Sequence, residues 1–379
     1  MQAKIKTAVA AAALLCAAGS ALADITVGAS LSLTGPGSGL GIPMSNGLKM
    51  WPTTIGGEKV HLIILDDATD PSKGVQNARR LVSEDHVDVI VGSGITPVAI
   101  AMADVAAESH TVQLALSPIG LPPGKDAWSF RMPQSNGVMA GAMVGHMARH
   151  GVKTVGFLGY TDAYGEQWLQ ALLPLLDKAG IKLVATERFA RADTSVTAQA
   201  LKLVAANPDA MVIVASGSGA AMPELALVER GYKGKYYQTH AAASKDLMRV
   251  GGKAVEGTYV VSGPVVVAEQ LPDSHPSKAL GVQFNTAYEK LYGPNTRNQF
   301  AAHGWDSYLL LDKIVPMALK KAKPGTPEFR AAIKEALETN PGLAVTHGVI
   351  DFTPTNHWGF RPDTGVVMKV VNGEWKLEP

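Results

Sequence analysis

Short apolar segments alternate with helical segments along most of this chain, and the alternation occurs twice. The first four apolar runs lie near residues 25–30, 60–65, 87–91 and 112–116. Four more follow a break, near residues 155–158, 182–189, 210–215 and 236–239. Strands that alternate with helices form parallel sheets covered by helices on their faces. The sequence therefore predicts an α/β fold with two successive lobes.

The last third of the chain is mostly helical. Helical spacing recurs near residues 277–292, 303–321 and 327–338, and short strands near 348–352 and 366–371 close the chain. The valine-rich stretch 255–267 is broken by glycines and a proline, so we interpret it as a crossover between lobes rather than a membrane span.

The N-terminal segment has the three parts of an export signal. Lys4 and Lys6 are followed by the apolar stretch 7–18 and by Ala21-Leu22-Ala23, a small-x-small cleavage pattern. Cleavage after Ala23 predicts a mature periplasmic chain that starts at Asp24. Cys16, the only cysteine, follows Leu15 rather than a small residue, so a lipid anchor is not expected.

The mature chain is close to neutral and lacks thiols. Loss of the leader with its two lysines leaves 32 basic and 33 acidic residues. This balance gives no basic footprint for nucleic acid. Without cysteine, the mature chain has neither disulfide nor thiol chemistry.

The segment 87–97 is typical of a ligand-binding turn. A buried strand ends at Gly92 and Gly94, Thr96 stands at the expected helix N-cap, and Pro97 suits the first helical position. Ligands of open α/β sheets bind beyond the carboxyl ends of the strands, where a helix N-terminus favours a carboxylate. The alternative is an ordinary strand–helix turn.

Several other patterns fall short of a catalytic or metal motif. The glycine-rich loop 31–41 precedes a helix predicted from about residue 43, but it lacks phosphate-loop and dinucleotide spacing. Segment 216–219 lacks the first glycine of a nucleophile elbow. We therefore expect no enzyme activity and no cofactor.

Two clusters of charged or imidazole side chains have residue types that can bind metal ions. His146 and His150 are spaced i, i+4, but no zinc-protease glutamate follows the first, so we interpret them as a solvated helix face. Asp66, Asp67 and Asp70 lack calcium-loop spacing and are expected to cap the next helix. The sequence predicts no metal site.

The chain resembles the type I periplasmic solute-binding proteins, in particular the branched-chain amino-acid and aromatic-acid group that serves ABC importers. The resemblance covers almost the whole mature chain. It is carried, in order, by Leu33-Thr34-Gly35-Pro36, Asp66-Asp67, Asp70-Pro71, Val91-Gly92, Ser117-Pro118, Phe130-Arg131, Pro133, Tyr164-Gly165 and Gly348 through Phe352-Thr353-Pro354 to His357.

This resemblance implies a Venus-flytrap architecture with three hinge crossovers and one ligand in the interlobe cleft. Lobe 1 would comprise residues 24–132 and 264–346, and lobe 2 residues 133–263 and 347–379. The implied ligand contacts are Ser38, Leu40, Ile95, Thr96, Ser117, Ile119, Gly120, Tyr164 and Phe300. We interpret segment 216–219 as a second-lobe loop at the cleft and expect Ser216 and Gly217 to contact the ligand as well.

The strand near 236–239 carries the main signal about ligand class. Amino-acid-binding members of the resembled family have a carboxylate near here for the ligand's α-ammonium group, whereas this chain has Gln238, Thr239 and His240. A buried ammonium without a counter-charge is costly. The sequence thus favours a small acid without an α-amino group, in particular an aromatic acid, with His240 or His303 donating to a ligand oxygen. If Asp162 reaches the cleft, a branched-chain amino acid is the alternative.

The resemblance implies a monomer that delivers its ligand to an ABC permease in the inner membrane. Two other functions stay open at this stage: an exported enzyme on a similar fold, and a ligand sensor that docks on a membrane receptor.

Overall fold

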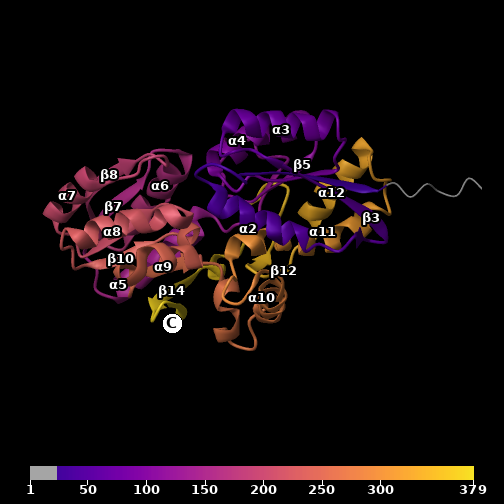
Figure 1. The fold of residues 1–379 in the computed structure, drawn as a ribbon. Helices are drawn as coiled ribbons and strands as arrows, with labels where there is room; N and C mark the ends of the chain where they lie inside the picture. The colour runs from indigo at the N-terminus through magenta and orange to yellow at the C-terminus, as the bar shows by residue number, and fades with distance from the viewer. Residues whose placement is uncertain (1–23) are drawn as a thin grey trace, which may run out of the picture.

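The computed structural model describes residues 24–379, which form two α/β lobes side by side (Figure 1). The predicted leader and its cleavage site after Ala23 lie outside the described residues. The first lobe contains a six-stranded sheet in the order β2-β3-β1-β4-β5-β6, and the second a seven-stranded sheet in the order β15-β14-β11-β10-β9-β7-β8. The predicted fold class is confirmed.

The sheet of the first lobe is parallel except at one edge. Its strands are β1 (Ile25–Leu31), β2 (Thr54–Ile55), β3 (Glu58–Asp66), β4 (Val89–Gly92), β5 (Val112–Ala115) and β6 (Ser129–Arg131), of which β2 pairs antiparallel with β3. Helices α3 (Pro71–Ser83) and α4 (Thr96–Glu108) lie on one side, and α2 (Ser38–Lys49) and α11 (Gln299–Ala318) on the other (Figure 1). Helix α12 (Pro327–Thr339) packs against α11.

The second lobe repeats this arrangement and ends in an antiparallel edge. Its parallel strands are β7 (Thr154–Tyr160), β8 (Lys182–Phe189), β9 (Ala210–Val214), β10 (Lys235–Gln238) and β11 (Tyr259–Ser262), and the edge is β14 (Val366–Val371) and β15 (Glu374–Glu378). Its helices are α5 (Asn136–Arg149), α6 (Ala163–Lys178), α7 (Thr197–Ala206), α8 (Ala221–Glu229) and α9 (Lys245–Gly251).

The remaining elements lie outside the two large sheets and the helices named above. They are α10 (Lys278–Tyr292), the small sheet of β12 (Leu343–Val345) and β13 (Gly348–Ile350), and 3₁₀ turns at Gly217–Ala220, His240–Ala242, Gly252–Val255, Pro264–Gln270 and Pro362–Thr364. No helix within residues 24–379 combines the length and apolar character needed to cross a bilayer.

Segments that cross between the lobes pack against one another. Gln134, just after β6, donates from Nε2 to the backbone oxygen of His347 at 2.8 Å. A Cβ on Gly263, just after β11, would lie 2.5 Å from the His347 ring and 2.9 Å from Gln134 Nε2. Only glycine fits there without displacing its neighbours, so the crossing segments form one packed hinge.

The last crossing lies later in the chain than the expected boundary after residue 346. Ile350, Phe352 and Phe360 belong to the core of the first lobe, whereas β14 pairs with β11 in the second sheet. We therefore propose that lobe 1 extends to about residue 360.

Two helices begin earlier than predicted. Helix α2 starts at Ser38 rather than near residue 43, and α11 starts at Gln299 rather than His303. The glycines of segment 35–41 suggested a loop, but Gly41 serves close packing: a Cβ there would lie 2.1 Å from the Ser32 backbone oxygen. Helix α11 is capped by Asn298, whose side chain accepts from the N–H of Phe300 at 2.8 Å.

A buried glutamate in α8 makes the folding stability of the protein depend on pH. Glu224 is fully buried and accepts hydrogen bonds from Gln238 Nε2 at 2.7 Å and from the Thr258 hydroxyl. Burial raises the pKa of Glu224 to about 7 from 4.5. The folded state therefore holds its proton more tightly than the unfolded state, and this group lowers stability as pH rises from about 4.5 to about 7.

We expect Glu224→Gln to remove that penalty, stabilising the protein by up to about 3 kcal/mol above pH 7 and little at pH 4.5. Urea unfolding at both pH values measures the difference. Glu229→Gln, on the same helix with a 72% exposed side chain, is the matched control. An equal effect of Glu224→Gln at both pH values would contradict the account.

Candidate functional site

A cavity lies between the two lobes. Its walls come mainly from segments that follow the carboxyl ends of the parallel strands and from the first turns of α2 and α11. The lining residues are Leu40, Met44, Gly94, Ile95, Thr96, Leu116, Ser117, Pro118, Pro133, Tyr164, Arg191, Ser216, His240, Ala241, Phe300 and His303. Nine of the residues expected at the ligand are among them.

The turn after β4 forms one wall, with a shift of one residue from the prediction. Ile95 is the N-cap of α4 and Thr96 is the first helical residue, and the structure shows no capping bond from either side chain. The β-branched Ile95 takes the extended N-cap conformation, while the Thr96 side chain lines the cavity. Thr96 is only 2% exposed, so its hydroxyl is available to a ligand rather than to bulk water.

The turn after β5 and the first turn of α11 complete this side. Ser117 is buried, and its Oγ has no hydrogen-bond partner within residues 24–379. Phe300 and His303 lie one turn apart on α11, which the Asn298 cap anchors at its start. A buried hydroxyl without a partner is unfavourable, so Ser117 is poised to bond a ligand or water.

Tyr164 closes the cavity from the second lobe. Its hydroxyl lies 2.7 Å from the Thr239 hydroxyl, and burial raises the Tyr164 pKa above its ordinary value. Its ring meets the His240 ring edge-on, with centroids 6.0 Å apart. Tyr164 therefore presents an uncharged ring fixed by a hydrogen bond at its tip.

Two buried histidines, His240 and His303, line the cavity. Burial and the nearby His347 lower the pKa of His240 to about 3, and the same causes, with His240, hold the pKa of His303 well below its usual value. Both rings are therefore neutral near pH 7. Nδ1 of His240 and both ring nitrogens of His303 have no hydrogen-bond partner in the described chain.

Arg191 is the charged lining residue that the sequence interpretation missed. It follows β8 in an irregular segment, where no hydrophobic period or motif marks it. Its Nη1 donates to Ser216 Oγ at 2.8 Å, and its guanidinium lies 4.1 Å from the centroid of the Tyr160 ring. Among the described residues that line the cavity, Arg191 alone carries a full charge, because both histidines are neutral.

Asp162 is the partner that holds Arg191 in place. One carboxylate oxygen accepts from Arg191 Nε at 2.5 Å. The other caps α6 by accepting from the N–H of Tyr164 at 2.9 Å and of Gly165 at 3.3 Å. Asp162 does not line the cavity and is engaged on both oxygens, so the structure does not offer it to a ligand ammonium group.

Four expected ligand contacts do not line the cavity. Ile119 is fully buried against the small residues Ala99 and Ala103 of α4. Gly120 is exposed and exchanges two hydrogen bonds with the Gln167 side chain, at 3.0 and 3.2 Å, which joins the lobes at the cleft rim.

The other two lie behind the lining residues. A Cβ on Gly217 would lie 3.1 Å from the Leu40 side chain, so Gly217 backs Leu40. Ser38 is half-buried at the start of α2, with its N–H bonded to the Gly35 oxygen at 3.1 Å. The predicted residues Leu40, Ser117 and Ser216 line the cavity in the same three segments, and the sequence does not show which residues of such a segment face it.

The structure also corrects the interpretations of the aspartate cluster at residues 66–70 and of the histidine pair on α5. Asp70 caps α3 as expected, through Lys73 N–H at 2.9 Å, but Asp66 and Asp67 instead bind the loops after β1 and β3.

Only one of the two histidines on α5 is exposed to solvent as expected. His150 is exposed, but His146 is fully buried, and burial, together with His150, Arg149 and Lys369, lowers the His146 pKa to about 4.

Comparison with known proteins identifies the family. The family model described as "Periplasmic binding protein" matches residues 24–373. This chain belongs to the periplasmic binding protein family. Members of this family are solute-binding proteins rather than enzymes, which excludes the exported-enzyme hypothesis.

Individual relatives support this family over nearly the full length. The "Leu/Ile/Val-binding protein homolog 3" of Brucella melitensis is 24% identical, over 94% of each chain. An extracellular ligand-binding receptor from Rhodopseudomonas palustris HaA2 is 46% identical, with a TM-score of 0.93 over 94% of this chain and 100% of the other. A second R. palustris solute-binding protein, solved with benzoate, shares the fold at 20% identity and a TM-score of 0.80 over 94% of this chain and 95% of the other.

The neutral state of the cleft histidines is directly measurable. With a pKa of about 3, the His240 ring stays uncharged between pH 8 and pH 5, so its ring nitrogen chemical shifts should not change over that range. Nitrogen-15 correlation spectra of the imidazoles measure this, and His240→Gln assigns the signal. A titration of His240 above pH 5 would show that its ring is not desolvated as described.

Proposed function

We propose that this periplasmic binding protein captures a small carboxylate without an α-ammonium group, in particular an aromatic acid, and delivers it to an ABC import permease. The observation that carries the proposal is the charge of the cavity. Arg191 is a cation at the cavity lining. Asp162 already accepts hydrogen bonds from Arg191 and from the N–H groups at the start of α6, so it is not directed at a ligand.

Charge explains why an amino acid fits less well. The ion pair with Asp162 offsets much of the charge of Arg191, but the free N–H groups of the guanidinium can donate to a carboxylate and not to an ammonium group, which has no acceptor. A buried ammonium also loses its hydration unless a carboxylate replaces it. A ligand carboxylate instead gains charge-assisted hydrogen bonds from Arg191, which has donors beyond those that bind Asp162 and Ser216.

The other walls suit a ring. Leu40, Ile95 and Phe300 are apolar and almost fully buried. Aromatic ligands pack favourably against such side chains. We propose that Thr96 and Ser117 contribute hydroxyls, and that neutral His240 or His303 bonds a ring hydroxyl or carbonyl.

The names of the relatives point to both ligand classes. One R. palustris neighbour was solved with benzoate, and the B. melitensis relative carries a Leu/Ile/Val-binding name. A branched-chain amino acid is therefore the second candidate. Export with cleavage after Ala23, a monomeric state and docking on a permease rather than a sensor receptor complete the proposal.

A ligand screen separates the two candidates. We expect benzoates and phenylacetates to raise the melting temperature and to bind with micromolar or tighter affinity by calorimetry, because a ligand stabilises the native state by mass action. Leucine, isoleucine and valine should give no response. Tight binding of those amino acids, with none of the aromatic acids, would overturn the ligand class.

Two variants of Arg191 test whether this residue binds the ligand carboxylate. Arg191→Met should weaken binding of the identified acid at least about tenfold, and Arg191→Lys, which keeps the charge but not the forked geometry, should weaken it less. Arg188→Met is the control, since Arg188 pairs with Glu166 on the surface of the same lobe. Urea unfolding of each variant separates lost binding from lost folding. Unchanged affinity in Arg191→Met would remove Arg191 from the site.

A further inference from the structure

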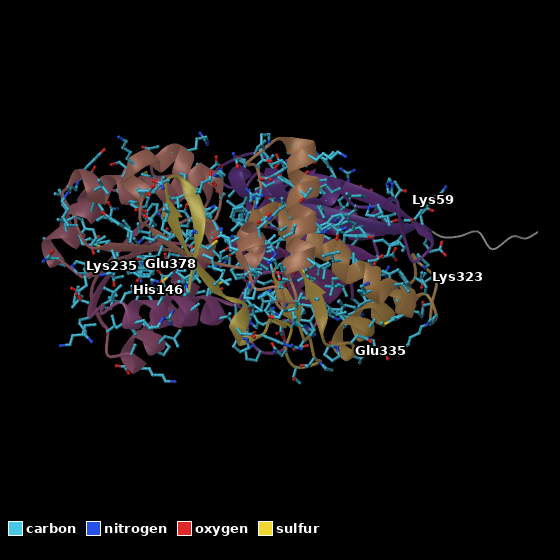
Figure 2. The ribbon with its side chains drawn as sticks, turned by 90° about the horizontal axis from the view of Figure 1, so that it is seen from below. Lys59, His146, Lys235, Lys323, Glu335 and Glu378 are labelled. Atoms are coloured by element: carbon cyan, nitrogen blue, oxygen red, sulfur yellow. The ribbon has the colours of Figure 1, made fainter. Side chains whose placement is uncertain are left out.

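Three potential metal ligands meet on the second lobe, outside the interlobe cavity. His146 and His150 lie on successive turns of α5, and Glu378 lies on the edge strand β15. Figure 2 shows His146 and Glu378 next to each other although they are far apart in the sequence. One donor atom from each of the three residues lies within 4.8 Å of the others, and His146 Nε2 is 4.0 Å from a Glu378 oxygen.

The hydrogen bonds of the two imidazoles favour free Nε2 lone pairs. His150 Nδ1 lies 2.9 Å from the backbone oxygen of His146 and must donate to it, because a carbonyl oxygen only accepts. The Nε2 of neutral His150 is therefore an acceptor. His146 Nδ1 lies 2.9 Å from the Tyr237 hydroxyl, which can accept from it. A metal-bound imidazole typically donates its other N–H to an oxygen in this way.

The buried nitrogen of His146 is the independent sign that a ligand is expected here. His146 is fully buried, and its Nε2 has no hydrogen-bond partner within residues 24–379. This atom is directed toward Glu378, and the two imidazole rings are stacked with centroids 3.8 Å apart. An unpaired buried nitrogen is unfavourable, and a metal ion would satisfy it.

We propose that His146, His150 and Glu378 bind a divalent transition-metal ion of the zinc class. Two imidazoles and one carboxylate are a known zinc donor set, with one position left for water. Ligand bonds of about 2.1 Å require the donor atoms to draw closer together than they are here. His150 is exposed and the Glu378 side chain is 21% exposed, so both can move toward the buried His146.

The surrounding charges restrict which ions fit. Arg149, next to His150, bonds the Pro379 oxygen at 3.3 Å, and Lys369 lies 5.1 Å from the centroid of the Tyr259 ring, which packs against His146. These cations oppose a metal held by charge alone. Magnesium and calcium prefer several oxygen ligands, so they should not bind, whereas zinc, cobalt and nickel accept imidazole nitrogen.

A metal ion at this site would join strand β15 to helix α5, which the pairing of strands in the sheet does not connect directly. Strand β15 is at the edge of the second sheet and pairs only with β14 in that sheet. A metal shared by Glu378 and the two histidines would tie this edge strand to α5. Occupancy should therefore stabilise the second lobe whether or not a ligand is in the cleft.

The test uses untagged, chelator-treated mature protein. Calorimetry with zinc chloride, and metal analysis after dialysis, should give one zinc per chain and a melting temperature raised by about 2 °C or more, while magnesium gives neither. His150→Ala and Glu378→Gln, both at accessible side chains, should each weaken zinc binding at least about tenfold. Cobalt absorption in the visible range reports the coordination directly.

His61→Gln, at an exposed histidine on the other lobe, is the matched control and should leave zinc binding unchanged. The proposal is overturned if zinc does not bind in a one-to-one ratio, or if neither His150→Ala nor Glu378→Gln weakens it. Equal loss in His61→Gln would also overturn it, because that result shows non-specific binding to surface histidines.

Discussion

The contact between Arg191 and Asp162 links the folding of the second lobe to the chemistry of the cleft. Asp162 caps α6 with one oxygen and binds the guanidinium with the other, so the helix that carries Tyr164 and the cation are positioned by the same carboxylate. The ring of Tyr160 supports the guanidinium from below at 4.1 Å. Because both oxygens of Asp162 are engaged within the protein, Arg191 is the charged group that lines the cavity, and the anionic ligand that we propose would be recognised through the free N–H groups of Arg191.

Buried polar atoms set a second constraint on the ligand. Ser117 Oγ, His240 Nδ1 and the ring nitrogens of His303 lack partners within the described chain. Each such group costs about 1–3 kcal/mol when it is buried without a hydrogen bond. A ligand with oxygen atoms in the right places recovers part of this energy. An apolar molecule of the same size does not, and this difference provides selectivity.

The sequence predicted the fold because hydrophobic periodicity is a local property, and β/α alternation has few compact solutions. It also located Thr96, since a strand, a tight turn and a helix start are each visible in short segments. It misplaced Ile119 because nothing local shows that this side chain packs against alanines of α4. Arg191 and Glu378 were missed because their partners lie on other elements: Asp162 is 29 positions from Arg191, and Glu378 meets α5 only after the last crossing.

Calorimetry with matched ligand pairs tests the central claim about charge most directly. Isocaproate has the side chain and carboxylate of leucine without its amine, and hydrocinnamate has the same relation to phenylalanine. Within each pair only the ammonium group differs, so cavity shape and apolar contact are held nearly constant. The account predicts that the amine-free acid of at least one pair binds at least about tenfold more tightly than its amino acid. Tighter binding of the amino acid in both pairs would contradict the account and would mean that the cleft supplies a negative charge.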